Sequence, residues 1–228
     1  MADAGMPNAG TIDDSGRARL LAGGIALLVL AAIVVQLLLN FDRAAAEGVP
    51  AWQVPFRLYG FFTIWANTLV ALVTSHFAVR GDRESLLARS GTRAAAVVYI
   101  AVVGVIYNSL LVQYNPQTGL RLAIDTIFHT VVPLAYPLWW LACVQRGRLG
   151  WGHAIPSIGL PLGYCGVAMG RGLLTGKYAY FFIDIGKYGL SQVLFNIAAL
   201  TLLHVGLMAA LIGLDRWLAR RAATAATS

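Results

Sequence analysis

The chain has 228 residues, of which 58% are apolar and only 12% are charged. Soluble domains usually carry about 25% charged residues, so this composition argues against a water-soluble domain and against disorder, coiled coil or collagen. The net charge of +7 does not indicate nucleic-acid binding, because the basic residues lie between apolar blocks. The composition instead predicts an all-α protein of the membrane class.

Six charge-free stretches follow one another along the chain. A helix needs about 20 apolar residues to cross ~30 Å of hydrocarbon. Only helices satisfy their backbone hydrogen bonds alone in lipid, and no alternating barrel pattern is present. We therefore expect a polytopic bundle of six transmembrane helices, at residues 20–41, 58–79, 94–120, 126–145, 149–170 and 188–214.

The distribution of basic residues predicts how this bundle is oriented. Eleven of the 17 Lys and Arg residues lie in the two tails and in the second-to-third and fourth-to-fifth connections. Cytoplasmic loops carry the excess of Lys and Arg, so both termini should be cytoplasmic. We expect a disordered cytoplasmic tail at residues 1–18, the six-helix domain at 19–219, and a cytoplasmic tail at 220–228, disordered from Ala222. The expected location is the plasma (cytoplasmic) membrane.

The fifth stretch is rich in helix-perturbing residues. Pro156 and Pro161 should kink it, and kinks in lipid survive where neighbouring helices satisfy the freed carbonyl groups. Its glycine pairs, 159/163 and 166/170, have the spacing that permits close helix approach. This span is expected to be central and tightly packed.

Four polar residues on four expected spans lie at one depth. They are five or six residues, roughly 7.5–9 Å, from the outer surface of the membrane. Polar residues in the membrane are costly and are therefore candidates for function. The four are Thr63, Asn108, His129 and Asn196.

The spacing along the chain adds further candidate residues to these four. Tyr59, Thr63 and Asn67 recur every four residues and form one polar stripe, and Asp125 lies four residues before His129. A hydroxyl becomes a nucleophile when a base takes its proton, and a third group often orients that base. Thr63 could therefore attack an ester carbonyl with His129 as base and Asp125 as orienting group. Asn108 or Asn196 could donate to the oxyanion.

Each of these residues also has a structural alternative. A transmembrane Thr commonly bonds the carbonyl four residues back, and Asp125 could simply favour a helix N-terminus. His129 could be a packed histidine, and Asn side chains often join helices. His76 and His204 lie in the inner half and could hold a haem, although packing is the simpler interpretation. Cys143 and Cys165 are expected to be packing residues, and the sequence predicts no metal site.

Three segments together resemble a known family. They are 61–67 (FFTIWAN), 125–133 (DTIFHTVVP) and 178–184 (YAYFFID). They are similar to the androgen-induced, six-span membrane proteins of animals and their bacterial relatives, over spans two to six. The animal members hydrolyse fatty acid esters of hydroxy fatty acids with an intramembrane Thr and His. By resemblance, this pair falls on Thr63 and His129.

The sequence thus favours an integral membrane hydrolase of lipid esters, with Thr63 and His129 as catalytic residues and Asp125, Asn108, Asn67 and Asn196 in support. Its expected partners are membrane lipid and a lipid ester substrate, with no nucleic acid and no cofactor. The alternative is a non-enzymatic bundle that binds or transports lipid or carries haem. A transporter would more often show charged residues or matching broken helices in both halves.

Overall fold

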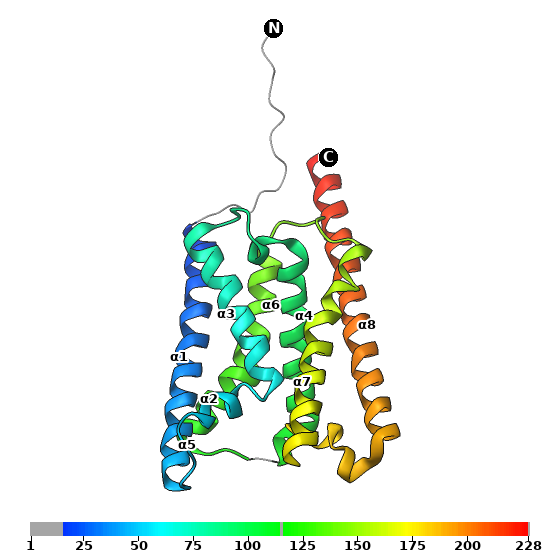
Figure 1. Cartoon of the computed structure of the whole chain (residues 1–228). Helices are drawn as coiled ribbons and strands as arrows, with labels where there is room; N and C mark the ends of the chain where they lie inside the picture. The colour runs from blue at the N-terminus through cyan, green and yellow to red at the C-terminus, as the bar shows by residue number, and fades with distance from the viewer. Residues whose placement is uncertain (1–15, 115, 228) are drawn as a thin grey trace.

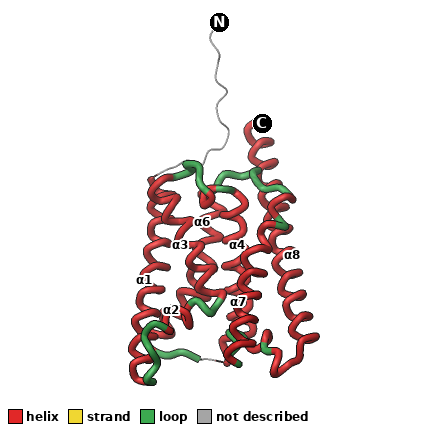
Figure 2. The backbone as a smooth tube through the Cα atoms, viewed as in Figure 1, coloured by secondary structure: helices red, strands yellow, loops and turns green. Residues whose placement is uncertain are grey.

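The computed structural model describes residues 16–114 and 116–227, and none of these residues belongs to a strand. The α-helices are α1 (Gly16–Ala46), α2 (Gln53–Leu58), α3 (Phe62–Arg80), α4 (Ser90–Ile106), α5 (Gly119–Thr126), α6 (Val132–Cys143), α7 (Gly159–Thr175) and α8 (Ile185–Thr227). Short 3-10 helices lie at Leu86–Ala88, Val112–Tyr114, Trp151–His153, Pro156–Ile158 and Phe181–Ile183. The long helices run side by side (Figure 1), and the connecting loops gather at the two ends of the bundle (Figure 2).

Two π-helical turns interrupt otherwise continuous helices. Tyr107–Leu111 extends α4, and Ile127–Val131 joins α5 to α6. Both turns contain residues that the sequence singles out, Asn108 in the first and His129 in the second. Single π-helical turns inside α-helices occur frequently at functional sites.

Within the described ranges, five helical stretches are long and apolar enough to cross a membrane. This is the arrangement of a helical membrane bundle, and the five stretches overlap expected spans one, two, three, four and six. They are Gly16–Ala46, Phe62–Arg80, Ser90–Tyr114, Gly119–Cys143 and Ile185–Ala225. The beginning of α1 and the end of α8 lie at the same end of the bundle (Figure 1).

Helix α1 shows how sequence patterning sets the packing. Its buried residues are small, and they repeat at helical spacing on the side that faces α3. Several of its leucines point away from the bundle, with Leu20 76% and Leu27 71% exposed. In lipid, small residues permit close helix contact while large apolar side chains face the hydrocarbon.

The fifth stretch was expected to be kinked at Pro161 and to be tightly packed at the centre of the bundle, and both expectations are wrong. α7 begins only at Gly159, so Pro161 lies in its first turn, where a missing N–H costs no intrahelical bond. A side chain at Gly159, Gly163, Gly166 or Gly170 would meet nothing within 4 Å. The glycines therefore face open space rather than a neighbouring helix, and α7 is peripheral. Only Tyr164, Ala168 and Gly172 of this helix are buried.

The second expected span is divided. Phe61 is extended (φ −112°, ψ 133°) and precedes the first residue of α3, whereas α2 ends at Leu58. Tyr59 thus lies outside α3, and its hydroxyl is 3.4 Å from that of Thr68. The expected polar stripe is reduced to Thr63 and Asn67.

The C-terminal segment also differs from expectation. α8 bends at Gly189, which has φ 75°, and it continues as a helix to Thr227. The expected disorder from Ala222 is therefore wrong through Thr227, because alanine-rich sequence has the highest helix propensity. Of the expected N-terminal tail, residues 1–15 lie outside the described residues.

Candidate active site

Thr63 differs from five other threonines of the described chain in what its hydroxyl bonds. It is the second residue of α3, so no helical carbonyl lies four residues before it. Its Oγ1 lies 3.2 Å from Nε2 of His129. Threonines deeper in helices donate instead to the carbonyl four residues back, as do Thr74, Thr126, Thr175, Thr201 and Thr224. The position of Thr63 at the start of α3 therefore frees its hydroxyl for His129.

The surroundings of His129 determine which ring nitrogen carries the proton. Nδ1 lies 2.9 Å from the backbone oxygen of Asp125 and 3.1 Å from its carboxylate Oδ1. Both neighbours are acceptors, so Nδ1 carries hydrogen and donates to them. Nε2 is then the unprotonated nitrogen and faces the Thr63 hydroxyl as an acceptor. This is the tautomer that a general base requires.

Tyr107 completes the arrangement, and the sequence argument did not identify it. Its hydroxyl donates to Asp125 Oδ2 at 2.6 Å, so both carboxylate oxygens have partners. Its ring stacks on the imidazole of His129, with centroids 3.5 Å apart and planes 12° from parallel. The only sequence signal was its position next to Asn108. Tyr107, Asp125, His129 and Thr63 form one continuous hydrogen-bonded chain.

Asn108 holds the two π-helical turns together. Its amide nitrogen donates to the carbonyls of Gly104 at 2.9 Å and His129 at 2.8 Å. Pro133 has no N–H, so the carbonyl of His129 lacks the partner that a regular helix would supply four residues later. Asn108 satisfies that carbonyl from the neighbouring helix. Its amide hydrogens are thus used to fix the backbone that carries His129.

The other two asparagines also bond backbone. Asn67 is fully buried, and its amide nitrogen lies 2.8 Å from the carbonyl of Thr63 and 3.4 Å from that of Phe128. Asn196, on α8, donates to the carbonyl of Phe182 at 2.8 Å. Asn67 therefore links the start of α3 to the π-helical turn that contains His129, and Asn196 anchors the connection between α7 and α8.

That connection brings Tyr180 to the start of α3. The Tyr180 hydroxyl accepts the backbone N–H of Phe62 at 3.0 Å and also interacts with Thr63. Burial raises the pKa of Tyr180, and the hydrogen bonds from Thr63 and Phe62 oppose this rise. The hydroxyl keeps its proton at neutral pH and lies beside Thr63. Tyr180 belongs to the 178–184 segment that carries the family resemblance, but no pattern in the sequence predicts a role for it.

The four hydrogen-bonded residues lie at the wall of a cavity of about 590 Å³. Thr63, Tyr107, Asp125 and His129 all line it, together with the arginines Arg43, Arg57 and Arg121. The side chains of His129 and Asp125 remain 12% and 18% exposed. Water and a ligand of moderate size can therefore reach the hydroxyl–imidazole pair from this cavity.

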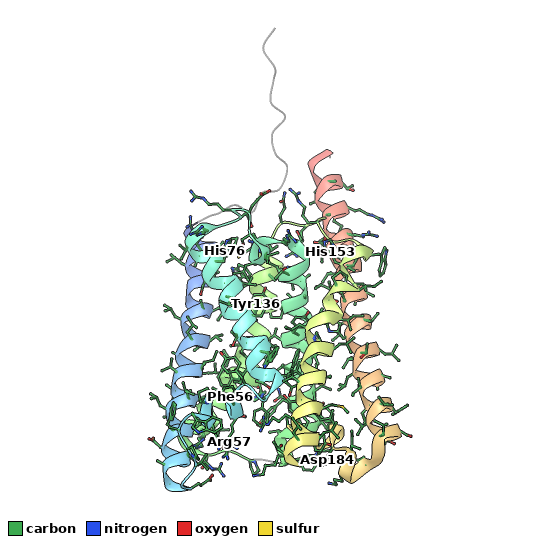
Figure 3. The ribbon with its side chains drawn as sticks, in the orientation of Figure 1. Phe56, Arg57, His76, Tyr136, His153 and Asp184 are labelled. Carbon is green, nitrogen blue, oxygen red and sulfur yellow. The ribbon has the colours of Figure 1, made fainter. Side chains whose placement is uncertain are left out.

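The remaining histidines have other surroundings. His204 is buried, with Nε2 3.0 Å from the Ser157 hydroxyl and its ring stacked on Tyr99 at 5.4 Å. His76 and His153 lie toward the opposite end of the bundle from Arg57 and Asp184 (Figure 3). The structure thus places His204 in a hydrogen-bonded packing position. Cys143 and Cys165 are both free thiols.

The assembled groups suit nucleophilic acyl transfer. An oriented imidazole faces a hydroxyl that has no competing helical acceptor, and a protonated phenol and a helix N-terminus lie beside it. The hydroxyl and the helix N-terminus come from α3, the imidazole comes from the π-helical turn between α5 and α6, and the phenol comes from the α7–α8 connection. Comparison with known proteins gives no match: no family model, no curated protein and no solved structure is similar to this chain at a significant level.

Proposed function

We propose that this protein is an integral membrane hydrolase of fatty acid esters, with Thr63 as nucleophile and His129 as general base. The observation that carries the proposal is the 3.2 Å contact between Thr63 Oγ1 and His129 Nε2, with Nδ1 held by Asp125. The resemblance of the 61–67, 125–133 and 178–184 segments to the androgen-induced membrane proteins supports the same two residues.

Acylation begins when His129 Nε2 takes the proton of Thr63. Oγ1 attacks the carbonyl carbon of the ester and forms a tetrahedral intermediate with a negative oxygen. When the bond to the alcohol oxygen breaks, His129 returns the proton to that oxygen and the alcohol leaves. Thr63 is then joined to the acyl group as an ester. Asp125 stabilises the imidazolium in both transfers, and Tyr107 holds Asp125 in place.

The start of α3 supplies the groups for the negative oxygen. The N–H of Phe62 points toward the Tyr180 hydroxyl beside Thr63, and a helix N-terminus favours negative charge. In this mechanism Tyr180 accepts this N–H and donates its own proton to the oxyanion. Such donors typically contribute about 10²- to 10³-fold in rate.

Deacylation repeats the sequence with water. A water molecule in the 590 Å³ cavity gives a proton to His129 Nε2 and attacks the acyl carbon. The bond to Thr63 Oγ1 breaks, Nε2 returns the proton to Oγ1, and the fatty acid is released.

We further propose that α7 crosses the membrane as the expected fifth span, which brings the number of spans to six, and that both termini are cytoplasmic in the plasma membrane. α7 has 17 residues and runs alongside α8 (Figure 1). The 3-10 turn Pro156–Ile158 lengthens its path. The excess of Arg near the shared end of α1 and α8 supports this orientation. The Thr63 site would then lie in the outer leaflet, where an ester can enter from the bilayer.

The test is labelling of the purified protein with a fluorophosphonate, together with hydrolysis of a p-nitrophenyl fatty acid ester. Thr63 should carry the adduct, and Thr63→Ala should remove both labelling and turnover. We expect losses on the order of 10⁴-fold for Thr63→Ala and His129→Ala, because both residues act in every proton transfer.

The matched controls are Thr126→Ala and His76→Ala. Thr126 donates to a helical carbonyl, and His76 lies at the other end of the bundle (Figure 3). Both should keep wild-type rates. Full activity in Thr63→Ala or His129→Ala would falsify the assignment.

A further inference from the structure

A second, narrow cavity begins at Thr63 and extends into the bundle between α4, α7 and α8. Its volume is about 100 Å³. Thr63, Tyr107, Leu111 and Tyr180 line both this cavity and the 590 Å³ cavity. Thr63 therefore lies at the junction of a wide compartment and a narrow one.

The walls of the narrow cavity are apolar along its length. Between Ile197 and His204 on α8 it extends over seven residues, or about 10 Å. The polar groups at its far end already have partners. Thr201 donates to the carbonyl of Ile197, and His204 bonds Ser157. An occupant therefore meets hydrocarbon rather than free hydrogen-bonding groups.

The volume limits what fits. One water-sized unit needs about 10–15 Å³ by this measure, so 100 Å³ holds about seven to ten such units. A methylene group is of similar size to a water molecule. The small volume and the length of about 10 Å along α8 thus match a single unbranched hydrocarbon chain.

We infer that the narrow cavity binds the acyl chain of the ester and that the alcohol part occupies the wide cavity. The inference rests on the proposed function and follows from the place of the proton donor. His129 and Asp125 line only the wide cavity. The leaving oxygen must receive its proton from His129 Nε2, so the alcohol leaves on that side. The acyl chain then extends the other way, toward Leu200 and His204.

The first test compares two substitutions on α8. Leu200 lines the narrow cavity, whereas Leu202 is 72% exposed on the outside of the helix. Leu200→Phe should shorten the cavity and lower kcat/KM for decanoyl relative to butyryl p-nitrophenyl esters by about 10- to 200-fold. Leu202→Phe should leave this ratio unchanged. Acetate esters of alcohols of increasing length should be hydrolysed equally by wild type and Leu200→Phe.

A second measurement does not depend on turnover. The Thr63→Ala variant is photolysed with long-chain esters that carry a diazirine either in the acyl chain or in the alcohol. Acyl probes should label residues of the narrow cavity, such as Leu162 and Leu200, and alcohol probes should label the wide cavity near Arg57 or Arg121.

The outcomes separate the two proposals. If wild type hydrolyses no ester but acyl probes label the narrow cavity, the hydrolase proposal fails and the binding site stands. Reversed labelling, labelling by neither probe in the narrow cavity, or a Leu200→Phe effect on alcohol length overturns the acyl-chain inference.

Discussion

Asp125 is the residue for which the geometry separates two expectations most clearly. From the sequence it could orient His129, or it could be a charge that favours the start of a helix. In the structure its Oδ1 faces His129 Nδ1 at 3.1 Å and its Oδ2 accepts the Tyr107 hydroxyl at 2.6 Å. A carboxylate held at both oxygens is fixed in orientation, and it fixes the imidazole in turn. This geometry favours an orienting residue over a simple helix-end charge.

We expect Asp125→Asn to lower kcat by about 10- to 10⁴-fold, because the imidazolium loses its negative partner and the Nδ1 tautomer is no longer enforced. The measurement is kcat and KM for a p-nitrophenyl ester in the purified protein. Asp42→Asn, which removes an exposed carboxylate on α1 near the same end of the bundle, is the control. Equal rates for the two variants would mean that Asp125 only stabilises the helix.

Tyr107 and Tyr180 show the limit of residue-level prediction. Neither breaks a hydrophobic pattern, since aromatic residues are common in membrane helices and at their ends. The role of each hydroxyl depends on its hydrogen-bond partner. Tyr107 bonds Asp125, and Tyr180 bonds the start of α3. Those partners lie far away in sequence, so local spacing carries no signal for them.

The helix ends and π-helical turns position the site. Thr63 is free to act because α3 begins at Phe62, and His129 is reachable because the chain widens into a π-helical turn before Pro133. Gly104 permits the contact between α4 and this turn. A side chain there would lie 2.8 Å from the Pro133 Cβ and 3.4 Å from the His129 oxygen. One small residue thus sets the approach of the two helices.

Gly104→Ala should therefore destabilise the protein by about 1–3 kcal/mol through overpacking. Gly163→Ala is the matched comparison, since its side chain would meet nothing within 4 Å. In a helix interior Ala is favoured over Gly by up to ~1 kcal/mol, so this variant should be neutral or more stable. The free energies of unfolding are measured by denaturant titration in detergent micelles. A greater loss of unfolding free energy for Gly163→Ala than for Gly104→Ala would mean that α7 packs tightly at the centre of the bundle.

For the molecule as a whole, orientation in the membrane decides from which side the site is reached. The Thr63 site lies at the end of the bundle opposite His76 and His153, toward Arg57 (Figure 3). The start of α1 and the end of α8 share the other end (Figure 1).

Single cysteines in a Cys143→Ala, Cys165→Ala background test this orientation in intact cells with a membrane-impermeant maleimide. Glu47→Cys and Lys177→Cys should be labelled from outside. These residues follow the C-terminal ends of α1 and α7, which are expected to face the outside of the membrane. Arg83→Cys and Arg148→Cys should react only after permeabilisation. Labelling of all four in intact cells, or the reverse pattern, would contradict the six-span arrangement with cytoplasmic termini.

The amino-acid sequence by itself indicated the helical membrane architecture and predicted one common depth for Thr63, Asn108, His129 and Asn196. Hydropathy along the chain fixes where helices lie, and a constant rise per residue converts position into depth. Only the tertiary structure decided the break before α3, the peripheral place of α7 and the narrow cavity. These depend on which faces meet, and the same glycine spacing that predicts close contact in α7 borders open space there. The two acceptors at His129 Nδ1 both belong to Asp125, so the four-residue spacing already indicated them, whereas the Tyr107 hydroxyl that holds the second carboxylate oxygen appears only in the tertiary structure.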